Sequence, residues 1–336
     1  MTTMVKAGIW GVGIGVPDRV LTNKDLEQMV DTSDEWITSR TGIRERRIAD
    51  PAQATSDLAL LAARKAMEDA RVDASEIDLI IVATVTPDSM FPATACLVQA
   101  GIGAAQAAAF DLSAGCSGFI YALEIAARCV EAGAYRRVLV VGADTLSRIT
   151  NWTDRSTCVL FGDGAGACVV GPVKQGGVLS MYLGADGTGG DKLHIPAGGS
   201  RLPLTAEAMQ EGKQYIHMAG NEVFKFAVRI MGDAAVEVIR RAGLQSEDIE
   251  LFVPHQANIR IIDAAAKRLG LTPEKVFVNV QKYGNTSAAS IPLALAEALE
   301  QDKIRPGDHV VLVGFGAGLT WGAAALQWNA EEDQLR

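Results

Sequence analysis

The sequence predicts an α/β fold built from two similar halves, and two observations support this prediction. First, four short segments are apolar throughout, which is typical of strands that helices cover on both faces. These segments are residues 79–83, 138–141, 251–253 and 310–313. Second, the chain matches itself over two separate blocks when it is shifted by 172 positions. Matches at one offset indicate a duplicated unit.

The matching blocks define the order of elements in each half. Residues 62–81 align with 234–253, and residues 122–142 align with 294–314. Each half therefore carries a helix, an apolar strand, a second helix and a second apolar strand.

The junction between the halves is predicted at the polar, glycine-containing segment 174–177. This divides the chain into residues 1–175, which carry a candidate nucleophilic cysteine, and residues 176–336, which carry a candidate histidine and asparagine.

Composition places the chain among ordinary soluble globular proteins. Of its 336 residues, 21% are charged and 49% are hydrophobic, and no apolar run is long enough to span a bilayer. The N-terminus lacks the apolar core of a signal peptide, and the five cysteines include no CxxC pair. A net charge of −9 argues against general nucleic-acid binding. We therefore predict a cytoplasmic protein with neither a membrane nor a nucleic-acid partner.

Cys116 is the leading candidate for a nucleophile. An apolar strand ends just before it and apolar residues then recur at helical spacing, which predicts that the thiol lies at a helix N-terminus. The N–H groups and dipole of a helix start favour an anion, so we expect a lowered thiol pKa. A lone cysteine is more often a packing residue, as we expect for Cys129 and Cys168. Gly115 and Gly118 favour a functional Cys116, because they let a backbone or ligand approach closely.

His255 and Asn285 are the predicted partners of this cysteine. His255 directly follows an apolar strand, and functional groups of α/β proteins gather past the carboxyl ends of strands. Asn285 lies in a glycine-led loop that opens onto a helix, where a plain helix cap is an equally good interpretation. In the duplicated pattern, Cys116 and Asn285 both lie at the start of the second helix of their halves. A pseudo-twofold axis would bring these two helix starts together.

Taken together, these motifs resemble the thiolase superfamily of condensing enzymes, and most closely the β-ketoacyl-[acyl-carrier-protein] synthase III family. The resemblance runs through most of the chain. Its motifs are residues 31–37, 40–43, 110–119, 161–167, 254–258, 283–287 and 314–322.

The resemblance implies a five-layer αβαβα fold, a homodimer, and a catalytic triad of Cys116, His255 and Asn285. In the family's reaction, the cysteine takes an acyl group from acyl-CoA, and malonyl-acyl-carrier-protein then loses CO2 and attacks the acyl-cysteine. The product initiates type II fatty-acid synthesis, and the reaction needs no metal and no cofactor, since acyl-CoA is a substrate. By resemblance, the backbone N–H groups of Cys116 and Ala317 form an oxyanion hole. Many relatives have glycine at position 317, so the donor survives here only if φ of Ala317 is negative.

Four residues are implied in CoA binding. Trp36 and Arg40 are four residues apart, which places them on one face of a predicted helix that a capping box of Thr32 and Glu35 would begin. On residues alone, these could be a packing tryptophan and a surface arginine. The resemblance implies that Trp36 and Arg155 stack on the adenine of CoA, with Thr32 and Arg40 nearby.

Two further surfaces are implied. Arg260, Lys267 and Arg268 share one helix face, and a basic face of this kind is either solvated surface or a docking site for an acidic carrier protein. Phe91 matches the family residue that closes the primer pocket from the partner subunit, and its bulky ring favours a short primer.

Competing interpretations remain open at this point. A cysteine hydrolase also carries Cys, His and Asn in this order, but the local Cys-Gly-Ser-Cys-Trp signature is absent. An acyl-CoA-binding module without catalysis would leave the ordered Cys-His-Asn set unexplained. Within the superfamily, enzymes that make quinolones, polyketide starters or long-chain ketones use the same triad.

Overall fold

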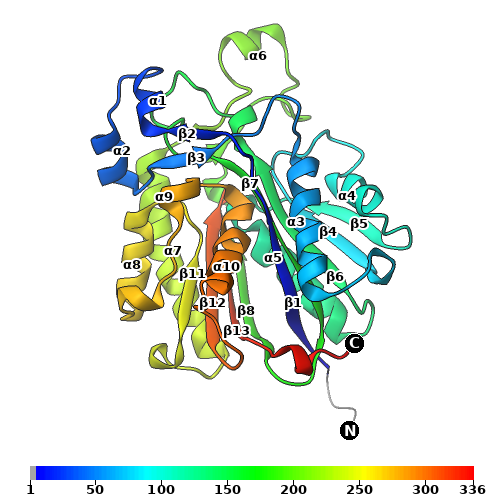
Figure 1. Cartoon of the computed structure of the whole chain (residues 1–336). Coiled ribbons are helices and arrows are strands. Elements are labelled where there is room, and N and C mark those ends of the chain that lie inside the picture. Colours follow the sequence, from blue (N-terminus) through cyan, green and yellow to red (C-terminus); the bar gives the residue numbers. More distant parts are fainter. Residues whose placement is uncertain (1–4) are drawn as a thin grey trace.

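Two β-sheets face each other across a central pair of helices in the computed structural model, which describes residues 5–336 (Figure 1). The strand order of the first sheet is β1 (Lys6–Gly15), β7 (Asp163–Val173), β6 (Val138–Thr145), β4 (Leu79–Ala83), β5 (Ala108–Leu112). β4 is parallel to both β5 and β6, whereas β7 is antiparallel to both β6 and β1.

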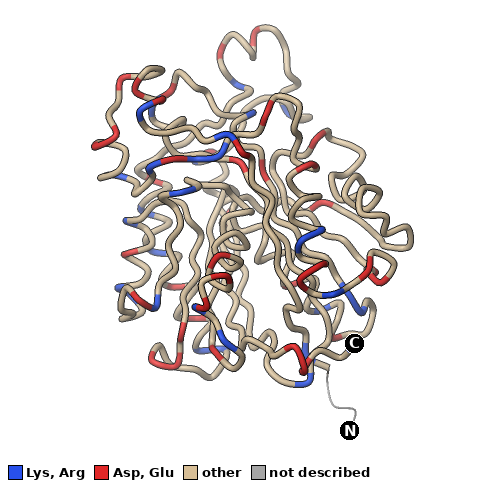
Figure 2. Tube along the Cα trace, viewed as in Figure 1, with Lys and Arg blue, Asp and Glu red and all other residues tan. Residues whose placement is uncertain are grey.

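The second sheet repeats this arrangement, except that an isolated parallel bridge between Phe252 and Val276 stands in place of β5. Its strand order is β11 (Leu251–Pro254), β12 (His309–Gly316), β13 (Thr320–Gln327), β8 (Gly177–Ala185). β11 and β12 are parallel, and the pairs β12–β13 and β13–β8 are antiparallel. The strands carry few charged residues, which instead lie mainly on the outer helices and loops (Figure 2).

Helices complete five layers. Between the two sheets lie α5 (Gly118–Glu131) and α10 (Ser290–Glu300), and each of them contacts strands of both sheets. The outer face of the first sheet is covered by α3 (Thr55–Ala70) and α4 (Thr94–Ile102). The outer face of the second sheet is covered by α7 (Gly220–Arg241) and α8 (Ile259–Leu269). The predicted αβαβα architecture and its duplication are therefore confirmed.

The offset of 172 positions also relates individual turns of the two halves. The 3₁₀ turns Gly115–Ser117 and Ser287–Ala289 are 172 positions apart, and each leads directly into its central helix. The predicted boundary between residues 175 and 176 stays a prediction, although β7 ends at Val173 and β8 begins at Gly177.

The remaining helices and strands are β2 (Val20–Thr22), α1 (Asn23–Glu27), α2 (Asp34–Thr41), β3 (Glu45–Arg47), β9 (Leu193–His194), α6 (Ala206–Gln210), β10 (His217–Met218) and α9 (Val280–Tyr283). Of these, α1, α2, β2, β3 and α6 lie in the upper part of the molecule in Figure 1. The predicted capping box of α2 is wrong: the N-cap is Ser33, whose hydroxyl accepts a hydrogen bond from the Trp36 N–H at 3.1 Å. No helix within residues 5–336 is long and apolar enough to cross a membrane.

The two helix starts meet through close backbone contact. A Cβ atom on Gly142 of β6 would lie 2.2 Å from the carbonyl oxygen of Ala288, so only glycine fits there. Likewise, a Cβ atom on Gly316 of β12 would lie 2.3 Å from the backbone nitrogen of Cys116. Each turn therefore packs against a strand of the opposite half, and this crossing positions the site.

Candidate active site

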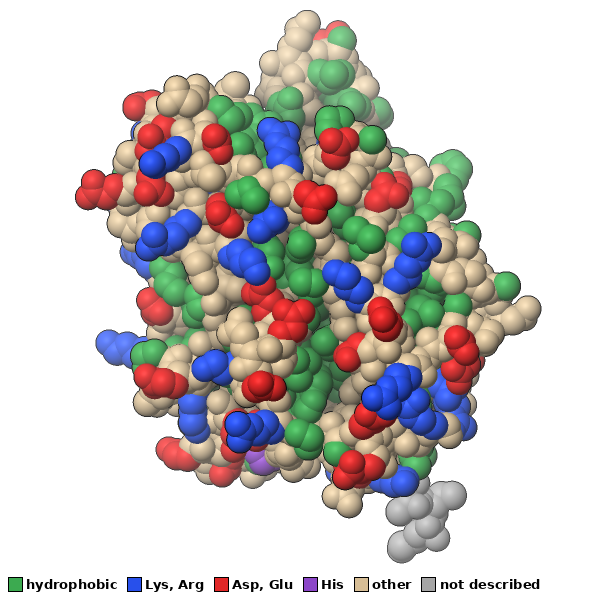
Figure 3. All heavy atoms as spheres, in the orientation of Figure 1, with side chains coloured by type: hydrophobic (Ala, Val, Ile, Leu, Met, Phe, Trp, Pro, Cys, Tyr) green, Lys and Arg blue, Asp and Glu red, His purple; other side chains and the backbone are tan. Residues whose placement is uncertain are grey.

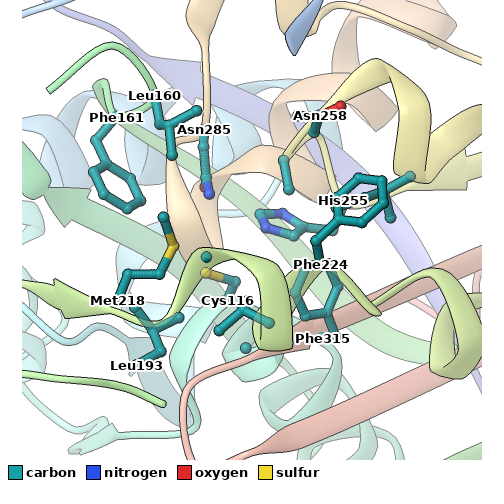
Figure 4. Close-up of a pocket in the computed structure, with 15 residues that line it drawn as sticks. Cys116, Leu160, Phe161, Leu193, Met218, Phe224, His255, Asn258, Asn285 and Phe315 are labelled. Atoms are coloured by element: carbon teal, nitrogen blue, oxygen red, sulfur yellow. The ribbon is translucent and has the colours of Figure 1, made fainter. Parts of the chain in front are cut away.

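Cys116 lies at the junction of two cavities. The first, called here the donor cavity, has a volume of about 120 Å³ and also receives His255 and Asn285 (Figure 4). The second, called here the apolar cavity, has a volume of about 210 Å³. Apart from Cys116, it is lined by Val85, Gly115, Leu146, Ile149, Phe161, Leu193, His194, Ile195, Ile216, Ser287 and Ala317. A thiol in this position can react with a substrate bound in one cavity and hold the transferred group in the other.

His255 is held rigidly, and one ring nitrogen is left free. Its backbone N–H donates to the carbonyl oxygen of Val313 at 2.7 Å, and its ring packs edge-on against Phe315 with centroids 5.5 Å apart. Nδ1 is 2.5 Å from the Ser290 hydroxyl oxygen. Nε2 is buried and has no hydrogen-bond partner among residues 5–336. Because the residue lines the donor cavity, Nε2 is available to a substrate.

Complete burial keeps His255 neutral. Desolvation lowers the pKa of the imidazole to about 3, because the charged form loses its hydration and no carboxylate compensates for it. Neutral imidazole can donate or accept a proton at one nitrogen while the Ser290 hydroxyl serves the other, because a hydroxyl can do both.

The side-chain oxygen of Asn285 is engaged within its own loop, and its amide nitrogen is not. Its backbone N–H donates to Leu160 O at 2.9 Å and its carbonyl oxygen accepts from Gly162 N–H at 3.0 Å, which pins the loop to a neighbouring segment. Its side-chain oxygen accepts from the Ser287 N–H at 2.9 Å. With the oxygen engaged in this way, the amide nitrogen points toward the cavity in Figure 4. Asn285 is therefore not a helix cap, since the N-cap of the 287–289 turn is Thr286 and that of α10 is Ala289, and its amide nitrogen is available to a substrate.

The expected lowering of the Cys116 pKa is not observed. Burial raises the pKa of the thiol to about 12, and the Asp144 carboxylate acts in the same direction, whereas the Ser287 hydroxyl and the Cys116 backbone N–H oppose them. The helix start does supply N–H groups, but desolvation of a thiolate outweighs them in this setting. The resting site therefore holds an uncharged thiol beside an uncharged imidazole.

The backbone nitrogens of Cys116 and Ala317 lie side by side. A Cβ atom on Gly115 would be 2.7 Å from the Ala317 nitrogen, and one on Gly316 would be 2.3 Å from the Cys116 nitrogen. Ala317 is not among the residues with positive φ. The alanine at this position is therefore compatible with a backbone donor.

Arg46 is a fully buried cation that braces the Asn285 loop. Its guanidinium donates to the carbonyl oxygens of Leu21 and Val159, at 3.1 and 2.8 Å, and to the side-chain oxygen of Asn23 at 2.9 Å. Desolvation lowers the pKa of the guanidinium to about 10. Val159 directly precedes Leu160, the partner of the Asn285 N–H. Arg46 therefore links β2 and α1, which carry Leu21 and Asn23, to the loop of Asn285.

Trp36 is the centre of a second cluster, at the surface. The guanidinium of Arg155 lies 4.9 Å from the Trp36 ring centroid, and that of Arg40 lies 5.9 Å from it. Arg155 also donates to the Asp31 carbonyl oxygen at 2.6 Å. The Thr32 hydroxyl, next in sequence, is buried without a partner among the described residues. The structure thus brings together all four residues that were implied in CoA binding.

The basic residues of α8 are exposed, and Arg260 lies near the donor cavity. Its guanidinium is 4.9 Å from the ring centroid of Phe224, which lines that cavity. Arg268 is engaged by Asp233 of α7 at 3.6 Å.

Phe91 lies on an exposed loop and lines neither cavity of its own chain. It is 85% exposed, and the adjacent Met90 is 81% exposed. Its predicted role in a primer pocket therefore depends on a partner subunit and stays a prediction.

Sequence analysis missed three polar residues around the triad: Asp144, Ser287 and Ser290. The repeat could have drawn attention to Ser287 and Ser290, because they align with Gly115 and Gly118 in the first half. Asp144, which is completely buried near the end of β6, carried no sequence signal beyond its strand. Within residues 5–336, no group of three or more His, Cys, Asp or Glu side chains is arranged to hold a metal ion.

A solved structure with the same fold identifies the class of protein. β-Ketoacyl-[acyl carrier protein] synthase III from Thermus thermophilus is 54% identical, with a TM-score of 0.89, and the match covers 96% of this chain and 99% of that one. Together with the cysteine at the junction of two cavities, this fold defines a condensing enzyme, which is an acyltransferase.

Sequence relatives identify the family. The models of 3-oxoacyl-[acyl-carrier-protein] synthase III and of its C-terminal part match residues 110–187 and 239–328. β-Ketoacyl-[acyl-carrier-protein] synthase III of Caldanaerobacter subterraneus is 60% identical over 98% of this chain and 100% of its own length. That of Symbiobacterium thermophilum is 62% identical over 96% and 98%. The chain belongs to the β-ketoacyl-[acyl-carrier-protein] synthase III family, the condensing enzymes of fatty-acid synthesis.

The lowered pKa of His255 predicts a specific acid sensitivity. The unfolded chain takes up a proton at His255 near pH 6.5, whereas the folded chain does so only near pH 3. Stability is therefore lost as the pH falls from 6.5 toward 3, by about 1.4 kcal/mol per pH unit from this group. We expect His255→Gln to lose less stability than the wild type between pH 6.5 and 5, measured by urea unfolding. Equal losses in both proteins would contradict a neutral, desolvated His255.

Proposed function

We propose that Cys116, His255 and Asn285 catalyse the decarboxylative Claisen condensation of a short acyl-CoA primer with malonyl-acyl-carrier-protein. The product is a β-ketoacyl-acyl-carrier-protein that initiates type II fatty-acid synthesis. The observation that carries the proposal is the position of the Cys116 thiol, between a cavity that offers two free donors and a cavity that is almost wholly apolar. Acyl-CoA is a substrate in this scheme, and no metal or cofactor takes part.

In the first half-reaction, the Cys116 sulfur attacks the thioester carbonyl of acyl-CoA. The thiol proton passes to His255 Nε2, and the Ser290 hydroxyl accepts from Nδ1 at that stage. The C–S bond to CoA then breaks, and the departing CoA sulfur takes the proton back from His255. The acyl chain remains on Cys116 and extends into the apolar cavity.

In the second half-reaction, malonyl-acyl-carrier-protein loses CO2. The electrons of the broken C–C bond move into an enolate whose negative charge rests on the thioester oxygen. His255 Nε2–H and the Asn285 amide nitrogen donate to this oxygen. Both groups are neutral, so they donate more strongly to the enolate oxygen than to the uncharged thioester oxygen of the substrate, and they form no ion pair with either.

The enolate carbon then attacks the acyl-cysteine carbonyl. The new C–C bond produces a tetrahedral oxyanion, to which the adjacent N–H groups of Cys116 and Ala317 donate. The oxyanion collapses and the bond to Cys116 sulfur breaks. The released thiolate then takes up a proton from solvent, because the original thiol proton left with CoA.

CoA binds at the Trp36 cluster, with the adenine between Trp36 and Arg155. An aromatic ring inserted there would hold the guanidinium and the indole about 7 Å apart, at two stacking distances. Arg155 is only 4.9 Å from the indole now, so its side chain must move outward as CoA enters. Thr32 and Arg40 flank the base, and the unpartnered Thr32 hydroxyl is free to contact it.

The enzyme acts as a homodimer in this proposal. β5 forms the edge of the first sheet and no further strand pairs with it within residues 5–336, so its backbone is available to a second copy. Exposed apolar side chains lie nearby in the fold, on the Phe91 loop. Hydrophobic side chains also lie along the projecting α6 region at the top of Figure 3. A partner's Phe91 would close the primer pocket.

The cytoplasm is the proposed location. Cys96, Cys116, Cys129, Cys158 and Cys168 are all free, which fits a reducing compartment.

Acyl capture should depend on Cys116 alone. Cys116→Ala should abolish both the uptake of an acyl group from acyl-CoA and condensation, because no other thiol borders both cavities. Cys129→Ala is the control and should retain both. Intact mass spectrometry after incubation with acyl-CoA measures the uptake, and acyl label on the Cys116→Ala protein would refute the assignment.

Arg260 and Lys267 should act through the carrier protein and not through CoA. A partner of acidic character needs a positive landing face on an enzyme of net charge −9, and such steering weakens with salt. The double variant Arg260→Glu and Lys267→Glu should raise the KM for malonyl-acyl-carrier-protein severalfold while sparing acylation of Cys116. Arg240→Glu on α7, where Arg240 pairs with Glu237, is a matched surface control. An unchanged KM in the double variant would mean that this face is ordinary solvated surface.

A further inference from the structure

Ser287 occupies a backbone conformation that disfavours a side chain. Its φ is +51°, in the left-handed region, where residues other than glycine are uncommon. The equivalent residue of the first half is Gly115, whose φ is +56°. The same turn is therefore built with glycine in one half and with serine in the other. A serine retained in a conformation that glycine adopts more easily points to a use for its hydroxyl.

The Ser287 hydroxyl lies between two ionisable groups. It is buried and has no partner at full hydrogen-bond geometry within residues 5–336. Burial raises the pKa of both the Cys116 thiol and the Asp144 carboxyl, and the Ser287 hydroxyl is close enough to each to oppose that rise. It also lines the apolar cavity beside Cys116. A buried hydroxyl without a full partner, next to a nucleophile, is available to a charge that develops there.

Asp144 has one oxygen saturated and one nearly free. Oδ1 accepts from the Thr84 hydroxyl at 3.0 Å, the Val85 N–H at 2.8 Å and the Thr86 hydroxyl and N–H at 2.9 and 3.2 Å. Oδ2 accepts only a long hydrogen bond, from the Ala288 N–H at 3.3 Å. This leaves Oδ2 with room for the hydroxyl of Ser287, which directly precedes Ala288.

We propose that the Ser287 hydroxyl is the side-chain donor to the Cys116 thiolate, with Asp144 holding that hydroxyl ready while the thiol is uncharged. The proposal rests on Cys116 being the nucleophile. The hydroxyl has one proton and no hydrogen-bond partner within residues 5–336. It faces the nearby Asp144 in the resting enzyme and turns to the sulfur when negative charge appears there. The same donor serves again when the thiolate leaves the β-ketoacyl product. No covalent bond changes at Ser287.

The charges around the thiol do not favour a thiolate, so a thiolate needs a hydrogen-bond donor. The ionisable groups that face the thiol are Asp144 on β6 and His255 after β11. The Cys116 turn also packs against β12, β13 and the 287–289 turn, and none of these three places an ionisable group next to the thiol. Asp144 repels a thiolate and His255 is neutral. A hydroxyl near the carboxylate and the sulfur gives the thiolate a hydrogen bond that Asp144 cannot supply, in addition to the one from His255 Nε2–H.

The glycine variant separates this role from a structural one. Ser287→Gly removes the hydroxyl but relieves the left-handed backbone, so the melting temperature should stay the same or rise. Ser287→Ala removes the hydroxyl and keeps the strain. Thr286→Val is the matched control, because it removes the neighbouring buried hydroxyl, which is also unpartnered but does not affect the Cys116 thiol.

The measurement is the rate at which iodoacetamide alkylates Cys116 between pH 6 and 10, followed by peptide mass spectrometry, with exposed Cys96 as an internal standard. In both Ser287 variants the Cys116 profile should move to higher pH, and acyl transfer from acyl-CoA should slow about tenfold to a hundredfold, as expected for one lost hydrogen bond to a charged atom. Thr286→Val should match the wild type.

Two results would overturn the proposal. The first is a wild-type pH profile of Cys116 alkylation in both Ser287 variants. The second is a loss of Cys116 reactivity in Ser287→Ala alone, which would assign the effect to backbone strain. A wild-type protein that takes up no acyl group at Cys116 would instead refute the proposed function, and the two failures are therefore distinct.

Discussion

The close contact between the two halves at their central helix starts is the constraint on which the rest of the site depends. Gly142 and Gly316 let the turns before α10 and α5 pack against strands of the opposite half without room for a Cβ atom. This contact places a cysteine from one half beside an asparagine and a histidine from the other. It also aligns the backbone nitrogens of Cys116 and Ala317. A larger residue at either glycine would separate groups whose spacing determines the chemistry.

Burial at this crossing determines how the site works. Desolvation keeps the thiol protonated and the imidazole neutral, so the resting enzyme carries no ion pair at its centre. A neutral pair can pass a proton in one half-reaction and present N–H donors in the next. In a dry site these donors act more strongly on a developing oxyanion than they would in water. Neutral donors that the fold holds in place thus do the work for which the sequence had led us to expect a charged Cys116 thiolate.

The sequence predicted the architecture well because the information was repeated. Apolar strands and a constant offset of 172 positions predicted two duplicated α/β halves and the approach of Cys116 to Asn285, whereas the five layers were implied by the family resemblance. Local patterns were less informative, because they do not report three-dimensional neighbours. The α2 cap fell one residue away, at Ser33, and the helix start at Cys116 gave the wrong direction for its pKa. Asp144 approaches Ser287 only in the fold, and although the repeat aligns Ser287 and Ser290 with Gly115 and Gly118, no sequence pattern singles out Asp144.

The central claim is that Asn285 donates to the enolate with its amide nitrogen while its oxygen accepts from the Ser287 N–H. Asn285→Asp tests it most directly, because a carboxylate keeps the accepting oxygen and removes the donor. The account predicts that this variant unfolds within about 1 kcal/mol of the wild type in urea, still acylates Cys116, and condenses at least about a hundredfold more slowly with malonyl-acyl-carrier-protein. Condensation at the wild-type rate would contradict it and would reduce Asn285 to a structural residue of its loop.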